Sequence, residues 1–255
     1  MEWIELDNGF NIPQLGYGTF QLKAGEVYDN VRCALENGYR MIDTAASYFN
    51  EQEIGRAIRD SGIPREEIVI STKVWVQDTG YEQTKKAFER SLENLQTGYI
   101  DIYLIHQPYG DYYGSWKAMG ELYRAGRIKA IGVCNFCTER LIDLTLNAEI
   151  PPMIDQVELH PFFQQKRLYA TLPKTCRIEA WGPLNEGQRN IFANPVLKYI
   201  ADRHHKTVAQ VVLRWLLEQG IIAIPRSGKS DHQKENIDHS DPLTVRILNT
   251  DHIHE

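Results

Sequence analysis

Residues 100–105 read IDIYLI, and this stretch sets the fold class of the chain. Apolar side chains fill almost every position of the run, which is typical of a parallel strand buried on both faces, although a run this short also fits a buried helix segment. Just before it, Thr84, Phe88, Leu92 and Leu95 recur at the spacing of one helix face. The sequence here therefore predicts a helix followed by a buried strand.

The same alternation of apolar runs and helical patterns repeats along the chain and makes eight strand–helix units. The expected strands are 14–18, 41–43, 68–73, 100–105, 130–133, 154–158, 178–180 and 221–224. No linker rich in Pro, Gly or Ser separates the units, so we predict an α/β fold, a (β/α)8 TIM barrel that forms one domain over residues 1–255. The competing arrangement is an open, doubly wound sheet, which would need the Gly-x-Gly-x-x-Gly turn that residues 16–21 lack.

A hairpin is expected before the first barrel strand. Residues 7–9, Asp-Asn-Gly, lie between short apolar runs at 3–6 and 10–12. Asn-Gly between two such runs is a strong signal of a β-hairpin. Because this hairpin has no place among the eight units, we expect it to close the bottom of the barrel.

Composition and charge limit the possible functions. The 255 residues are 42% hydrophobic and 24% charged, as in an ordinary globular protein. The formal net charge of −6 argues against nucleic acid or an anionic membrane as the main partner. No apolar run approaches the roughly 18 residues of a membrane span, the start is acidic, and only 4 cysteines occur. These features indicate a globular protein of the cytoplasm. We also expect a monomer whose partner is a small molecule.

Four polar residues lie at or just beyond the C-terminal ends of expected strands, where TIM barrels place their active sites. They are Asp43, Tyr48, Lys73 and His106. Each one alone has an ordinary interpretation, as a helix cap, a packing residue, an exposed strand end or a loop histidine. An acid, a lysine, a histidine and a tyrosine on one rim together predict a catalytic centre.

Seven blocks of the sequence resemble the aldo-keto reductases and follow the order of that family. They lie at residues 38–55, 71–75, 104–108, 131–136, 155–161, 179–184 and 224–236. The chain is most similar to bacterial members of the diketogluconate reductase type. The resemblance implies an NADP-dependent oxidoreductase that reduces aldehydes and small ketones, with NADPH as the cofactor and NADH as a second one.

The resemblance makes Asp43, Tyr48, Lys73 and His106 a catalytic tetrad, with Tyr48 as the proton donor. A free tyrosine, with a pKa of about 10, is a poor acid near neutrality. We expect the Lys73 cation to draw the pKa of Tyr48 down toward the working range. Asp43 should pair with Lys73, and a neutral His106 should orient the substrate carbonyl.

The resemblance also implies the contacts to the cofactor and the substrate. Asn135 and Gln156 should bind the nicotinamide carboxamide, and Trp181 should stack on the nicotinamide ring. The expected cofactor-binding residues are Gly18, Thr19, Asp43, Asn135, Gln156, Trp181, Gly182, Leu184, Arg226, Ser227, His232, Glu235 and Asn236. The expected substrate-binding residues are Phe20, Trp75, His106 and Tyr109, in an open aromatic pocket that Tyr112 and Tyr113 also line.

The chain departs from the family pattern at several positions. Cys134 and Gly182 stand where serine is usual or common, and His232 stands where many members have arginine. The stretch from about residue 238 onward fits the usual ending of the family poorly. A second hypothesis also stays open, a cofactor-binding barrel without catalysis that serves as a sensor, subunit or structural protein, although the intact tetrad favours the enzyme.

Two short motifs suggest a metal or redox site. Cys134 and Cys137 have the spacing of a redox dithiol or of half a zinc site, but no second cysteine pair follows. The pairs His204-His205 and His252-x-His254 have no carboxylate or cysteine partner in a motif. We therefore expect no bound metal.

Overall fold

Eight parallel strands, joined in chain order, form the central sheet. They are β3 (Tyr17–Gly18), β4 (Met41–Asp43), β5 (Val69–Val74), β6 (Ile100–Ile105), β7 (Ile128–Cys134), β8 (Ile154–Glu158), β9 (Arg177–Trp181) and β10 (Ile222–Ala223). The computed structural model describes residues 2–238. Every strand expected from the sequence is present in it, although several begin or end one to three residues away from the predicted bounds.

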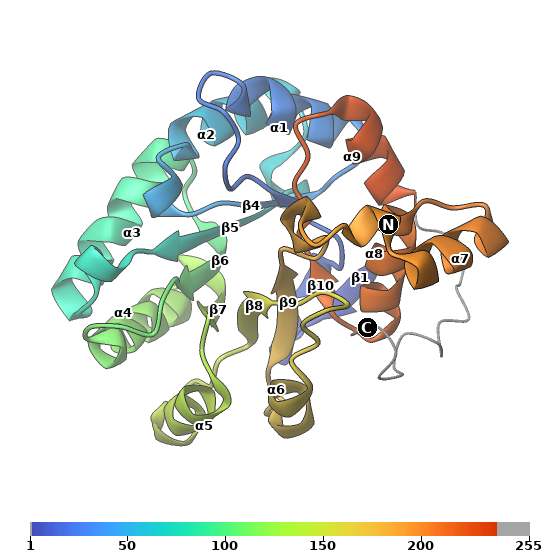
Figure 1. Cartoon of the computed structure of the whole chain (residues 1–255). Helices are drawn as coiled ribbons and strands as arrows, with labels where there is room; N and C mark the ends of the chain where they lie inside the picture. Colours follow the sequence, from blue (N-terminus) through green and yellow to red (C-terminus); the bar gives the residue numbers. More distant parts are fainter. Residues whose placement is uncertain (1, 239–255) are drawn as a thin grey trace.

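The helices lie outside the strands, where they surround the sheet (Figure 1). They are α1 (Val27–Glu36), α2 (Glu51–Ser61), α3 (Tyr81–Leu95), α4 (Tyr112–Arg124), α5 (Thr138–Asn147), α6 (Lys166–Thr171), α7 (Pro195–His204), α8 (Val208–Glu218) and α9 (Ser230–Ile237). One helix follows each strand, except that both α7 and α8 follow β9. The predicted (β/α)8 TIM barrel is confirmed.

The predicted helix faces are the buried ones. In α3, the side chains of Thr84, Phe88, Leu92 and Leu95 are buried against the barrel. The helix ends at Gln96, which adopts the left-handed conformation common at helix C-termini. Burial of this apolar face, rather than intrinsic helix propensity, holds such a helix on the sheet.

The barrel closes between its first and last strands by few contacts. Leu15 forms a parallel bridge with Ala223, and the Gly18 N–H donates to the Pro225 carbonyl at 3.0 Å. A Cβ atom at Gly18 would lie only 2.8 Å from the carbonyl oxygen of Ile224. Glycine therefore permits the close approach of the two chain segments at this position.

The N-terminal hairpin lies at the bottom of the barrel. It consists of β1 (Trp3–Glu5) and β2 (Asn11–Pro13). In the turn of the hairpin, Asn8 Nδ2 donates to the Lys129 carbonyl at 2.8 Å. The Glu5 carbonyl of β1 accepts a hydrogen bond from Arg177 at 3.2 Å. Lys129 and Arg177 lie at the N-terminal ends of β7 and β9. The predicted hairpin and its position are confirmed.

Within residues 2–238, no helix is long and apolar enough to cross a membrane. The C-terminal stretch that fits the family poorly, with His252 and His254, lies outside the described residues.

Asp155 is a carboxyl group inside the core of the barrel. Its side chain is fully buried on β8, and no side chain of the described residues forms a hydrogen bond with its carboxyl oxygens. Burial raises the pKa of Asp155 well above its ordinary value. The folded protein therefore keeps this carboxyl group protonated at pH values at which an unfolded chain ionises it.

We expect Asp155→Asn to raise the Tm by several degrees at pH 7. The unfolded carboxyl loses its proton above a pKa of about 3.9, whereas the folded one keeps it, so wild-type stability falls as the pH rises above that value. Asparagine has nearly the same shape and no proton to bind. A gain of about 1 kcal/mol corresponds to roughly 2–4 °C in Tm for a domain of similar size.

Thermal unfolding followed by circular dichroism at pH 7 and pH 5 measures this effect. The difference in Tm between the variant and the wild type should narrow at the lower pH. An equal Tm at pH 7, or a difference that does not change with pH, would contradict the protonation of Asp155 in the folded protein.

Candidate active site

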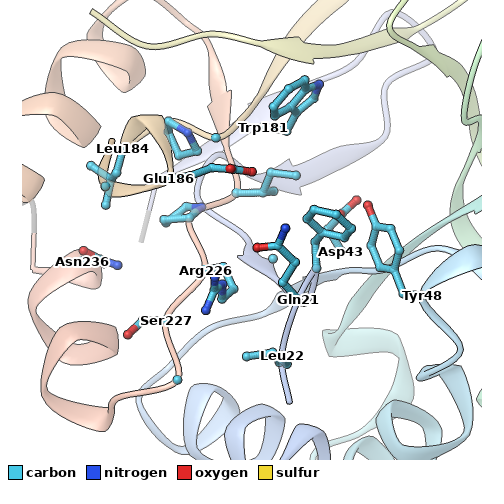
Figure 2. A pocket seen from close by; sticks show the side chains of 18 of the residues that line it. Gln21, Leu22, Asp43, Tyr48, Trp181, Leu184, Glu186, Arg226, Ser227 and Asn236 are labelled. Atoms are coloured by element: carbon cyan, nitrogen blue, oxygen red, sulfur yellow. The ribbon is translucent and has the colours of Figure 1, made fainter. Parts of the chain in front are cut away.

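A cavity of about 1050 Å³ opens at the C-terminal ends of the strands. Asp43 at the end of β4, Trp181 at the end of β9 and Asn236 of α9 all line it. Figure 2 shows Asp43 and Tyr48 at one end of this cavity and Ser227 and Asn236 at the other. TIM barrels carry their active sites on this face. Because the cavity extends from Asp43 and Tyr48 to Ser227 and Asn236, one ligand can contact different residues at its two ends.

Lys73 and Asp43 form a buried ion pair beneath the cavity. Lys73 Nζ lies 2.8 Å from each carboxylate oxygen of Asp43, and it also donates to the Thr44 carbonyl at 2.7 Å. Burial by itself would lower the pKa of Lys73, but the Asp43 carboxylate outweighs it and raises that pKa above the ordinary value. Lys73 is therefore a fixed cation at neutral pH.

Tyr48 lies on the 3-10 turn Ala46–Tyr48 that follows β4, beside this cation. Its ring centre is 5.2 Å from Lys73 Nζ, 4.9 Å from the Phe20 ring and 5.6 Å from the His106 ring. Burial raises the pKa of Tyr48 to about 12, although the Lys73 cation acts in the opposite direction. The expected net lowering of the Tyr48 pKa is therefore wrong, because desolvation of a phenolate in this wall exceeds the stabilisation by Lys73.

His106 follows β6 directly and faces the same end of the cavity. Its Nδ1 lies 3.3 Å from Ser47 Oγ, and its ring lies 4.9 Å from that of Trp75 in an edge-to-face arrangement. Burial, with help from the Lys73 cation, lowers the pKa of His106 to about 3. The imidazole is therefore neutral at pH 7, with one ring nitrogen able to donate a hydrogen bond and the other able to accept one.

Asn135 lies next to these residues in a strained backbone conformation, with φ of 62°. Its Nδ2 donates to the His106 carbonyl at 3.2 Å, and its Oδ1 accepts from Trp181 Nε1 at 2.9 Å. Non-glycine residues adopt this conformation mainly at turns and functional sites. The two hydrogen bonds fix the Asn135 side chain in one orientation against the wall of the cavity.

The other end of the cavity is polar and carries cationic side chains. Arg226 and Lys229 are exposed, and His232 and Asn236 of α9 line the cavity beside them. The hydroxyl of Ser227 accepts a hydrogen bond from the Lys229 N–H at 3.1 Å, which orders the turn before α9. This group of residues offers the N–H donors and positive charge that phosphate groups need.

Among residues 2–238, no group of three or more His, Cys, Asp and Glu side chains is arranged to hold a metal ion. Cys134 is buried and Cys137 is exposed. The absence of a bound metal stays a prediction.

Comparison with known proteins identifies the family. A sequence model of the aldo/keto reductase family matches residues 14–245. The chain belongs to the aldo/keto reductase family. Its relatives include the glyoxal reductase of Bacillus subtilis, which is 48% identical over 238 residues that span 92% of this chain and 86% of that protein.

Two solved structures have the same fold. An aldo-keto reductase from a Medee basin deep-sea metagenome library superposes with a TM-score of 0.91 at 44% identity, covering 93% of this chain and 89% of that one. A mutant of Gox0644 in complex with NADPH superposes with a TM-score of 0.88 at 37% identity, covering 93% of this chain and 87% of that one. The resemblance seen in the sequence is thus confirmed at the level of the family.

This aldo/keto reductase brings most of the expected residues to one cavity. Asp43, Tyr48 and His106 line it, and Lys73 lies behind Asp43. Thr19 is fully buried outside the lining, where its hydroxyl donates to the Asp43 carbonyl at 2.9 Å. The other expected cofactor-binding residues that line the cavity are Gly18, Asn135, Gln156, Trp181, Gly182, Leu184, Arg226, Ser227, His232, Glu235 and Asn236. Their binding roles stay predictions.

The expected substrate pocket is only partly formed by the expected aromatic residues. Phe20 and Trp75 line the cavity, whereas Tyr109, Tyr112 and Tyr113 do not. Tyr109 is 61% exposed, and Tyr112 stacks on Tyr113 with 4.7 Å between ring centres. A contact between Tyr109 and the substrate stays a prediction.

Sequence reasoning missed several residues that border the cavity. Gln21 and Leu22 enter it from the loop after β3, and Glu186 enters it from the loop after β9 (Figure 2). Gln21 and Glu186 both have positive φ, at 57° and 49°. Positive φ is uncommon at Gln and Glu, and no sequence pattern predicts it there. The sequence therefore does not indicate where these two side chains point.

Proposed function

We propose that this chain is an NADPH-dependent reductase that transfers a hydride to aldehydes and small ketones, with Tyr48 as the proton donor. The observation that supports this most is the fully buried Lys73 ammonium, which is paired with Asp43 and lies 5.2 Å from the centre of the Tyr48 ring. A buried cation beside a phenol stabilises the phenolate that remains when the proton leaves.

The side chains at this end of the cavity divide the remaining work. Bound NADPH would supply the hydride. Neutral His106 donates a hydrogen bond to the carbonyl oxygen and so orients the substrate. Because its pKa lies far above 7, Tyr48 keeps its proton until negative charge develops on that oxygen, and then transfers it there. Lys73, fixed in place by Asp43, stabilises the charge left on Tyr48.

The residues present fit a dinucleotide that carries an extra phosphate. Arg226 and Lys229 bring two cationic side chains to the end of the cavity remote from Tyr48. The planar guanidinium of Arg226 suits bidentate contact with phosphate. The NADPH complex of the related Gox0644 mutant supports the same assignment. NADH lacks the 2′-phosphate, so we propose it as a weaker second cofactor.

Preference for NADPH over NADH should be incomplete, because His232 stands where many relatives have arginine. Replacing it by His232→Arg adds a permanent cation to the lining of the cavity near Arg226. The variant should increase the ratio of the NADH to the NADPH dissociation constant by about 2- to 5-fold, the size of effect expected for an exposed ion pair. Quenching of tryptophan fluorescence measures both constants.

His232→Gln is the matched control, because glutamine has a similar size and no charge. Its ratio of the NADH to the NADPH dissociation constant should stay within about 2-fold of the wild-type value. A wild-type ratio below one, or no increase in His232→Arg, would contradict the assignment of this end of the cavity to the phosphate.

The alternative is a barrel that binds the cofactor without catalysis. The decisive assay mixes the protein with NADPH and a panel of carbonyl compounds, and follows the near-ultraviolet absorbance of the reduced nicotinamide. The relative named glyoxal reductase makes glyoxals the first substrates to include, with aromatic aldehydes and keto sugars beside them. Consumption of NADPH supports the reductase. Tight binding of NADPH with no consumption for any carbonyl would favour the alternative.

We also propose that residues 1–255 form one domain and that the protein is a cytoplasmic monomer that binds neither nucleic acid nor membrane. The net charge of −6 and the small number of cysteines support this.

A further inference from the structure

Glu179 is a buried carboxyl group that the reaction described above does not use. It lies on β9, its side chain is fully buried, and it does not line the cavity. Its Oε1 accepts a hydrogen bond from Gln156 Nε2 at 2.8 Å. The same nitrogen donates to Asp43 Oδ1 at 2.9 Å. One amide nitrogen therefore joins Glu179 to the ion pair of Asp43 and Lys73.

The register of the sheet makes this link possible. Gln156 of β8 and Glu179 of β9 are paired residues of neighbouring parallel strands, and Ile222 of β10 pairs with Glu179 on the other side. Ile222 is apolar, so Gln156 is the partner that the neighbouring strands offer to the carboxyl group. The other carboxyl oxygen, Oε2, has no hydrogen-bond partner among the described residues.

The link also fixes the orientation of the Gln156 side chain. An amide has two N–H donors, and both are engaged here by carboxyl oxygens. The amide oxygen, Oε1, points toward Cys134 and lies 3.6 Å from its Sγ. Cys134 and Gln156 both line the cavity. A rotated amide would turn its oxygen toward the Asp43 carboxylate, where both groups are acceptors.

We propose that Glu179 is a positioning residue that acts as the neutral acid and holds Gln156 with its amide oxygen available to a donor in the cavity. The inference rests on the proposed function, in which that donor is the carboxamide of the nicotinamide. Glu179 touches neither the cavity nor the reacting atoms, so its effect passes through Gln156 and Asp43.

The neutral form follows from the charges around the site. The titratable groups that act on Glu179 from the other strands are Asp43, Lys73 and Cys134. The one ammonium of this group contacts both oxygens of Asp43, and Glu179 forms no ion pair in the described part of the chain. Burial, with the nearby Asp43 carboxylate, raises the pKa of Glu179 to about 8. Its ionisation above neutrality places a second negative charge beside Asp43, and we expect this charge to oppose the stabilisation of the Tyr48 phenolate by Lys73.

Two variants separate the hydrogen bond from the charge. Glu179→Gln keeps the shape of the neutral acid and an acceptor for Gln156, but it cannot ionise. Glu179→Met removes the acceptor and leaves one N–H of Gln156 unpaired in a buried place. Asp155→Asn is the control, because it changes another fully buried carboxyl group of the barrel that forms no hydrogen bond with the site.

Glu179→Gln and Asp155→Asn should bind NADPH as the wild type does at pH 7, whereas Glu179→Met should raise the dissociation constant by about 3- to 10-fold. In the wild type, kcat/KM for carbonyl reduction should fall as the pH rises through the pKa of about 8 of Glu179. This fall should be absent from Glu179→Gln. Infrared spectra at pH 7 should lose one protonated carboxyl band in Glu179→Gln relative to the wild type.

Three results would overturn the proposal. They are an intact carboxyl band in Glu179→Gln, wild-type NADPH affinity in a folded Glu179→Met protein, or the same pH profile above 7 in the wild type and Glu179→Gln. If Glu179→Met does not fold, the band and the pH profile of Glu179→Gln still decide. A wild type that binds NADPH and never consumes it would instead contradict the proposed function, and the infrared and affinity measurements remain valid in that case.

Discussion

Tyr48→Phe is expected to lower the kcat for carbonyl reduction by about 10²- to 10⁴-fold, the range that general acid catalysis contributes. Phenylalanine keeps the ring that packs against Phe20 at 4.9 Å and His106 at 5.6 Å. Only the hydroxyl group is lost, so the cavity keeps its shape. The NADPH dissociation constant and the Tm should therefore stay close to those of the wild type.

Tyr169→Phe is a suitable control for this variant. Tyr169 is exposed on α6, it does not line the cavity, and its hydroxyl donates to the Gln219 carbonyl. Its removal should leave kcat unchanged. The role of Tyr48 as proton donor is wrong if Tyr48→Phe keeps more than about a tenth of the wild-type kcat under conditions in which both variants bind NADPH.

Lys73→Met is expected to cause two separate losses. Reduction should slow by at least about 100-fold, because no cation then stabilises the phenolate of Tyr48. The free energy of unfolding should fall by about 3–5 kcal/mol, since the Asp43 carboxylate is left buried without its partner. Steady-state assays with NADPH give the first loss, and urea unfolding gives the second.

A double variant distinguishes the two losses. Asp43→Asn combined with Lys73→Met removes both charges, and the new amide still offers an oxygen that accepts the hydrogen bond from Gln156. The stability of this protein should return most of the way to the wild-type value, while its activity stays low. A Lys73→Met protein as stable as the wild type would contradict the buried ion pair, and a double variant with restored activity would contradict the role of Lys73.

The fold could be predicted because its signals are local. Each strand is a short apolar run, each helix shows an apolar face, and Asn8-Gly9 marks the turn of the hairpin. These patterns arise because apolar side chains are buried at a regular spacing along each helix and strand, and this spacing can be seen in the sequence. The start of β3 could not be placed, because residues 14–16 are buried like the strand itself but pair with the last strand through the bridge of Leu15 and Ala223.

The residues that meet in the site could be predicted from the sequence, whereas the pKa of Tyr48 could not. Asp43, Tyr48 and His106 follow their strands closely, so the barrel rule brought them together. The pKa of Tyr48 depends on how deeply the ring is buried between Phe20 and His106, which no spacing in the sequence gives. Tyr112 and Tyr113 lie outside the cavity because Asp111 caps α4 through the Gly114 N–H, which places both tyrosines on the first turn of that helix.

The short closure between β3 and β10 gives this barrel a seam. Both strands are two residues long, whereas the other strands of the sheet have three to seven residues. The same cavity is lined by Gly18 on one side of the seam and by Ile224 and Arg226 on the other. A ligand that contacts both sides therefore bridges the first and last strands. Occupancy of the site and closure of the barrel are then linked, since whatever binds only the closed form also stabilises it.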